Sequence, residues 1–145
     1  MNAEQVFGIA NQFAIVCWIL LLGSLFWSRL RTGTQWLGTF GVPLIIGVTY
    51  VLALSMDYPS PQGGFGSIAD VRLLFASDWL LLAGWVHYLV FDYFVGAWIV
   101  RDSQRCDVLP ILVLPCLFFC FMAGPLGLLM YLALRGGRQL MAKPA

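Results

Sequence analysis

The sequence predicts an all-α integral membrane protein, a single-domain bundle of four transmembrane helices. Hydrophobic residues make up 61% of its 145 positions and charged residues only 10%, which gives a mean hydropathy of +0.86. Soluble domains carry about 25% charged residues, and a chain this short has too much surface to hide so many apolar side chains from water. Four segments reach the roughly 20 apolar residues that a helix needs to cross a bilayer. They cover about residues 7–27, 37–56, 79–100 and 109–134.

The first two segments are predicted to form an antiparallel hairpin, because only the short link 28–36 separates them. Ala10 and Ala14 in the first segment are small residues four positions apart on one helix face, so a neighbouring helix can approach closely there. Pro43 in the second segment lacks an N–H donor and should leave the Thr39 carbonyl without its helical partner. Helices are expected throughout, because strands in lipid need a closed barrel of about eight or more.

The connection between the second and third segments, about residues 57–78, is the longest stretch outside the predicted spans. Its first part, Pro59–Gly66, holds too many prolines and glycines for regular structure. Ser67 with Asp70 three residues later is a helix-start signal. Residues 68–76 are therefore predicted to form a short amphipathic helix at the membrane interface.

The fourth segment contains Gly124-Pro125 within an apolar run, so we expect a kink there. The basic tail from about residue 136 is predicted to be disordered. If all four segments cross, the basic residues divide four against four and the positive-inside rule gives no orientation. They are Arg29, Arg31, Arg101 and Arg105 on one side, and Arg72, Arg135, Arg138 and Lys143 on the other.

The third segment carries two ionisable residues near its middle, His87 and Asp92. His87 is the protein's only histidine, and Asp92 is the only acid within a predicted span. At 1.5 Å per residue, both lie within roughly 5 Å of the bilayer centre. Since an isolated charge there costs several kcal/mol, Asp92 should face protein and be protonated or paired. Tyr88 is on the same helix face, whereas His87 is about 140° away, and Asn11 of the first segment could reach the same interior.

Few kinds of chemistry remain open to such a chain. One histidine cannot build a multi-histidine metal centre, and the four cysteines form no C-x-x-C pair, so we expect no metal site and no cofactor. A net charge of +1 gives no electrostatic case for nucleic acid. Proton transfer between a carboxylic acid and an imidazole or phenol remains. The alternative is a hydrogen-bond network of the same residues that only fixes helix packing.

Short motifs spread over residues 6–134 carry a family resemblance. They are Gly63-Gly64-Phe65-Gly66-Ser67, Leu82-Ala83-Gly84-Trp85-Val86-His87-Tyr88-Leu89, Phe91-Asp92, Gly96-x-Trp98-Ile99-Val100-Arg101-Asp102, Pro115-Cys116 and Gly124-Pro125-Leu126-Gly127. In this order they resemble the neoxanthin-synthase-like family, also called abscisic-acid-deficient-four-like. The resemblance implies a multi-span membrane protein whose plant members act in plastid membranes, in making neoxanthin from violaxanthin. That reaction opens an epoxide and forms an allene without net redox change.

Such an isomerisation needs an acid at the epoxide oxygen and a base for a carbon-bound proton. Asp92, His87 and Tyr88 are the predicted catalytic residues. The predicted contacts with a carotenoid or related isoprenoid are Asn11, Trp85, Phe91 and Phe65. The chain starts almost directly with its first span, without a transit segment, which suggests a bacterial member in the inner membrane.

Two other functions stay open at this point. A non-catalytic membrane protein would bind pigment or lipid, or assist the assembly of a membrane enzyme. A transporter would have to oligomerise, because no inverted repeat is visible. The expected partners are a lipophilic small molecule and membrane lipid, but not nucleic acid, and self-association is left open.

Overall fold

The computed structural model of the chain describes residues 1–57 and 62–141, and all regular elements in this part are helical. The helices are α1 (Ala3–Ser24), α2 (Ser28–Trp36), α3 (Val42–Met56), α4 (Ile68–Leu74), α5 (Asp78–Arg105) and α6 (Pro110–Met141), and a π-helical turn, η1 (Leu37–Gly41), joins α2 to α3. Among the described residues, four stretches are long and apolar enough to cross a membrane, namely Ala3–Ser24, Ser28–Met56, Asp78–Arg105 and Pro110–Arg138. The predicted fold class is therefore confirmed.

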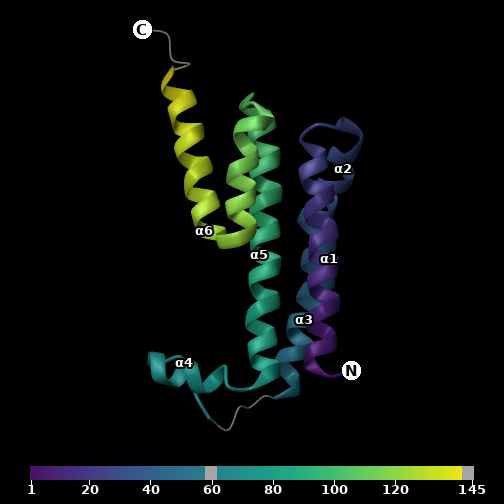
Figure 1. The fold of residues 1–145 in the computed structure, drawn as a ribbon, viewed down its shortest axis with the longest axis vertical. Helices are drawn as coiled ribbons and strands as arrows, with labels where there is room; N and C mark the ends of the chain where they lie inside the picture. Colours follow the sequence, from purple (N-terminus) through teal and green to yellow (C-terminus); the bar gives the residue numbers. More distant parts are fainter. Residues whose placement is uncertain (58–61, 142–145) are drawn as a thin grey trace.

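Helix α5 lies at the centre of the bundle and contacts α1, α3 and α6 (Figure 1). Small residues let the helices approach closely, as expected for packing in lipid. Ala10 and Ala14 of α1 are buried, with 7% and 2% of their surface exposed. Further along α1, the Trp18 ring packs against Gly96 of α5, and a Cβ at this glycine would lie 2.6 Å from a ring carbon.

The second apolar stretch begins earlier than predicted. Residues 28–36, which we expected to be a link, form α2, and only 25–27 connect it to α1. The polar residues of this stretch are compatible with a helix because several of them face outward, while the Thr34 hydroxyl donates to the Leu30 carbonyl 2.9 Å away. The irregularity expected near Pro43 is present as η1, where the Val42 N–H donates to the Leu37 carbonyl five residues back.

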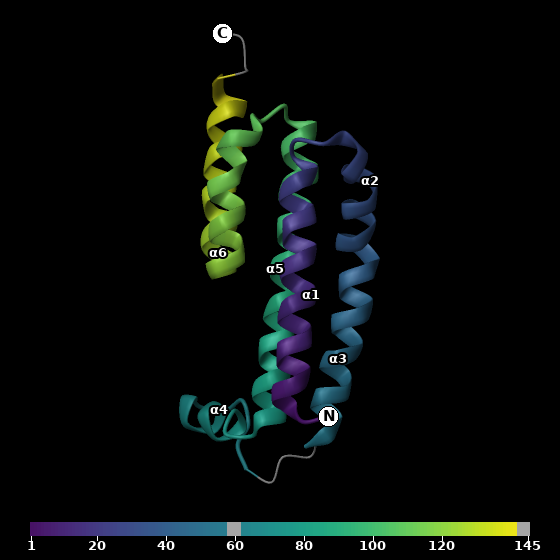
Figure 2. The same cartoon turned by 45° about the vertical axis from the view of Figure 1, so that its right-hand side comes forward.

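The short helix predicted at 68–76 is present as α4, although it ends at Leu74. Ser67 caps it as expected, since its hydroxyl accepts a hydrogen bond of 3.1 Å from the Asp70 N–H. Figures 1 and 2 show α4 to one side of the beginning of α5, running transverse to the long helices. Its placement at a membrane interface stays a prediction. Residues 58–61 of the preceding connection lie outside the described part of the chain.

Helix α6 folds back on itself instead of running straight. Ala123 has non-helical angles (φ −157°, ψ 65°), directly before the Gly124-Pro125 pair at which we predicted a kink. Figures 1 and 2 show the chain descending beside α5 to about half its length and then returning to the end where α6 began. We call residues 110–122 the first limb and 124–141 the return limb. The fourth apolar segment is thus a hairpin of two limbs and not one straight helix.

The two limbs touch closely just beyond the break. A Cβ at Gly127 of the return limb would overlap the backbone of the first limb at Cys116 and Cys120. Glycine is therefore required at this crossing, because any side chain would push the limbs apart.

The return limb is fixed to the end of α5 by polar contacts. The Tyr131 hydroxyl donates to Asp102 at 2.6 Å, and Arg135 forms an ion pair with the same carboxylate at 2.8 Å. Arg138 donates to the Asp107 carbonyl at 2.6 Å. These contacts explain why the chain remains helical to Met141, where we expected a disordered tail from about residue 136.

The hairpin also changes the distribution of charge that four crossings would have given. It brings the end of α6 to the end of the bundle where α1 and α5 end (Figure 2). There Arg135 contacts Asp102 and Arg138 contacts Asp107. We call this end of the bundle the arginine end. It carries six of the seven arginines in the described residues, namely Arg29, Arg31, Arg101, Arg105, Arg135 and Arg138. Among the described basic residues, only Arg72 lies at the other end, together with Glu4, Asp57, Asp70 and Asp78, so the predicted even split does not hold. Lys143, which that split also counted, lies outside the described part of the chain.

Candidate functional site

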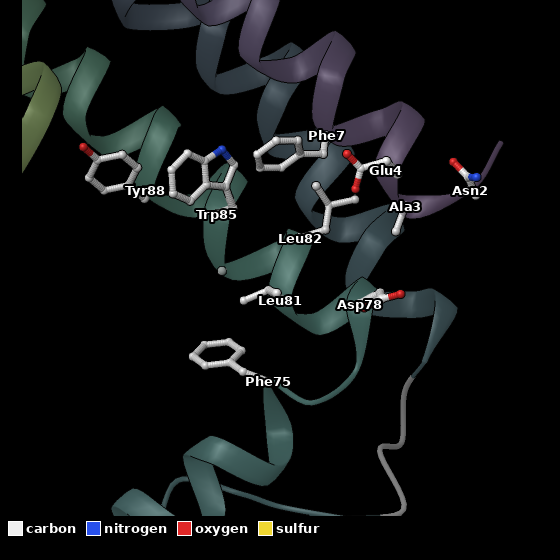
Figure 3. Close-up of a pocket in the computed structure, with 11 residues that line it drawn as sticks. Asn2, Ala3, Glu4, Phe7, Phe75, Asp78, Leu81, Leu82, Trp85 and Tyr88 are labelled. Carbon is white, nitrogen blue, oxygen red and sulfur yellow. The ribbon is translucent and has the colours of Figure 1, made fainter.

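A groove of about 630 Å³ lies along the first half of α5, at the end opposite the arginine end. It is bounded by the first turns of α1 and by Phe75, which follows α4 (Figure 3). This volume falls in the usual range for small-molecule sites. Leu81 and Trp85 in its wall are 54% and 40% exposed, so the groove is open along one side.

The residues that line the groove come from α1, α5 and the segment around Phe75, and α6 turns back about halfway along α5. The hairpin covers the half of α5 nearer the arginine end and leaves this side of the other half uncovered (Figure 1).

Aromatic rings form the main wall of the groove. The Trp85 ring lies 5.5 Å from that of Phe7 on α1 and 5.5 Å from that of Tyr88 one turn along α5 (Figure 3). The Trp85 indole N–H donates to Asn11 Oδ1 at 3.0 Å, while Asn11 Nδ2 donates to the Phe7 carbonyl at 2.8 Å. Asn11 therefore holds the tryptophan in place, and the structure brings together these two predicted ligand contacts.

The polar groups of the groove lie at its two ends. Asn2, Glu4 and Asp78 are at the end near the N-terminus, and Tyr88 is at the other (Figure 3). The Tyr88 hydroxyl donates to the Phe121 carbonyl at 2.7 Å. In a continuous helix that carbonyl would accept from residue 125, which is proline and has no N–H. Tyr88 thus replaces the hydrogen bond that Pro125 removes from the apex of the hairpin.

Asp92 lies one turn beyond Tyr88, beneath the hairpin apex, and is 8% exposed. Its carboxyl faces the Tyr88 hydroxyl and the Gly124 N–H. Within the described residues, its Oδ2 is buried without a hydrogen-bond partner. A Cβ at Gly124 would overlap Oδ1 and lie 2.7 Å from the carboxyl carbon, so only glycine fits against the acid.

Three predicted site residues lie elsewhere. His87 is exposed, with its ring 4.5 Å from Phe91 and 5.8 Å from Tyr50 of α3. Phe91 is 55% exposed, and Phe65, in the loop before α4, is 88% exposed. No hydrogen bond joins His87 to Asp92 in the part of the chain that the structure describes. The structure therefore brings Asp92, Tyr88, Trp85 and Asn11 together and leaves the other three outside.

The model of the ABA4-like family, described as ABA DEFICIENT 4-like, matches residues 5–131. The chain belongs to the ABA4-like family. This confirms the predicted resemblance, and the match includes the aromatic wall of the groove, Asp92 and the hairpin apex. No curated protein and no solved structure matches the chain significantly.

Sequence reasoning missed several features of this ABA4-like protein. Phe7 and Phe75 line the groove but lie at the ends of their segments, where aromatic residues usually anchor a helix in the membrane interface. The Asp102 contacts were also missed, although the four-residue spacing of Tyr131 and Arg135 indicated a shared helix face. No group of three or more residues suited to hold a metal ion occurs among residues 1–57 and 62–141.

Proposed function

We propose that this ABA4-like protein binds a carotenoid or related isoprenoid in the groove and isomerises it by proton transfer at Tyr88 and Asp92. Family membership supports a link to carotenoid metabolism, and the four apolar stretches support a multi-pass membrane protein. The predicted location, a bacterial inner membrane, is part of the proposal.

The observation that carries the proposal is the position of Tyr88. Its phenol lies at the inner end of an aromatic groove that is open along one side, and the buried Asp92 carboxyl lies directly behind it. Aromatic faces suit a conjugated chain. The end group of the ligand would reach Tyr88, while the rest of a long polyene stays in the membrane through the open side.

The chemistry needs no cofactor, because isomerisation leaves atoms and electrons unchanged. One proton goes to the epoxide oxygen as its C–O bond breaks, and one proton leaves carbon as the new double bond forms. In the proposed site, protonated Asp92 supplies the first proton through the Tyr88 hydroxyl, and the same pair accepts the second. The pair is thereby restored after each turnover. His87 faces α3 and has no part in this scheme.

The test uses purified protein in lipid vesicles with violaxanthin as a candidate epoxy-carotenoid, and products separated by chromatography. Tyr88→Phe and Asp92→Asn should each lower turnover by about 100-fold or more, the usual contribution of general acid–base groups. Tyr50→Phe is the matched control, since this tyrosine lies beside His87 outside the groove. Turnover by Tyr88→Phe and Asp92→Asn at the wild-type rate would exclude the proposed roles.

A second candidate function is non-catalytic binding of pigment or lipid. It is favoured by the contacts of the hairpin apex, because Tyr88 holds the Phe121 carbonyl and Asp92 packs against Gly124. If these residues serve only the fold, the gently purified protein should carry a polyene absorption band and release that ligand unchanged. Tyr88→Phe would then lower stability without altering any product.

A further inference from the structure

The arginine end has an excess of positive charge that the fold does not neutralise. This end carries six arginines but only two carboxylates among the described residues, those of Asp102 and Asp107. Arg135 is paired with Asp102, and Arg138 donates to a backbone carbonyl. In the described residues, the other four arginines form no ion pair. They are Arg29, Arg31, Arg101 and Arg105.

A hollow of about 390 Å³ lies at the arginine end, between the start of α2 and the end of α5. Of these four arginines, Arg31 lines it, and its Nε donates to the Ser24 carbonyl 3.5 Å away. Gln104 also lines it, together with the apolar side chains of Leu25 and Leu109. The Gln104 side-chain nitrogen is buried and has no hydrogen-bond partner in the described part of the chain. The hollow therefore offers a positive charge and an unused N–H donor beside apolar surface.

We propose that the arginine end binds the headgroups of anionic phospholipids, with the phosphate in this hollow. The phosphate would accept hydrogen bonds from Arg31 and Gln104, while Leu25 and Leu109 contact the start of the acyl chains. Asp107 also lines the hollow and opposes an anion, so the attraction must come from Arg31 together with the longer-range field of the other arginines at this end. Basic residues beside a membrane are attracted to anionic lipid in this way.

The same charge distribution sets the orientation of the protein. Basic residues near the ends of spans are retained on the cytoplasmic side, or on its equivalent in an organelle, and anionic lipids are enriched there. The arginine end should face that side. The groove then opens into the opposite half of the bilayer. This consequence for ligand entry rests on the proposed function, but the proposed binding of anionic lipid does not.

The experiment is native mass spectrometry of the purified protein with phosphatidylglycerol or phosphatidylcholine of identical acyl chains. Wild type should retain phosphatidylglycerol with a preference of about tenfold or more, given the attraction per basic residue. Changing the four unpaired arginines together to glutamine should abolish the preference, whereas lysine at the same positions should preserve it. Arg72→Gln, at the other end, is the control, and circular dichroism verifies the helical fold of each variant.

Equal retention of the two lipids by wild type would overturn the proposal, and this result does not depend on how any variant folds. A preference that survives the glutamine substitutions would overturn it as well. Displacement of phosphatidylglycerol by millimolar inorganic phosphate would show that the hollow takes free phosphate instead of lipid. Because no carotenoid is present, the result is independent of the proposed isomerase activity.

Discussion

Replacing Tyr131 by Phe tests whether the return limb of α6 is held against α5 as the structure has it. Tyr131 is fully buried, and its hydroxyl donates to Asp102 at 2.6 Å. A hydrogen bond to a charged group contributes about 1.5–3 kcal/mol net, but polar contacts measured inside membrane proteins average about 0.6 and reach about 1.7 kcal/mol. Because Asp102 keeps 15% of its side chain exposed, we expect a loss of about 1–2 kcal/mol, within the range of such contacts.

Hydrogen exchange measured by mass spectrometry locates this loss. A change of about 1–2 kcal/mol corresponds to roughly 5–30-fold faster exchange in the return limb, with little change in α1 or α3. Tyr93→Phe is the matched control, since Tyr93 is also fully buried but its hydroxyl has no hydrogen-bond partner in the described part of the chain. The reasoning fails if Tyr131→Phe leaves the return limb unchanged, or if Tyr93→Phe loosens it equally.

Two further predictions concern the groove and the path of α6. Gly84→Leu should fill part of the groove and weaken carotenoid binding about tenfold or more, as measured by absorption titration. The control is Gly47→Leu on α3, where an added Cβ would have no atom within 4 Å, and it should leave binding unchanged. If both glycine variants bind equally well, the ligand lies elsewhere. In sealed vesicles, a membrane-impermeant maleimide should label Cys106 and the cysteine of Gly137→Cys from one side of the membrane, and the cysteine of Ala69→Cys from the other side. If Gly137→Cys and Ala69→Cys are labelled from the same side, α6 crosses the membrane as a straight helix.

The hairpin of α6 shows where prediction from sequence stops. The stretch 109–134 is long enough to cross a bilayer, and Gly124-Pro125 indicates only a kink. The size of the bend depends on contacts between residues far apart in the chain, such as Tyr131 with Asp102. The Ser67 cap of α4, in contrast, depends on residues three positions apart and was predicted correctly.

The placement of the candidate site residues was predictable in the same partial way. The proximity of Tyr88 to Asp92 follows from their four-residue spacing on one helix face, whereas the hydrogen bond of the Tyr88 hydroxyl to the Phe121 carbonyl does not. His87 is five residues from the acid, and the resulting rotation of about 140° carries it to the side of α3. Phe7 and Phe75 come from two other parts of the chain, so their presence in the groove depends on tertiary packing. Their sequence positions alone give no sign of it.

The groove and the hairpin share one hydrogen bond, and this links ligand binding to the fold. Pro125 removes the helical partner of the Phe121 carbonyl, and the Tyr88 hydroxyl replaces it. A ligand oxygen that takes the Tyr88 proton must therefore leave that carbonyl without its donor, at a cost of about 1–3 kcal/mol if it stays buried and unpaired. A purely hydrocarbon end group leaves this hydrogen bond intact and incurs no such cost. An oxygenated end group at the proposed site must therefore offset the cost with the new hydrogen bond to Tyr88 and its contacts with the aromatic wall of the groove.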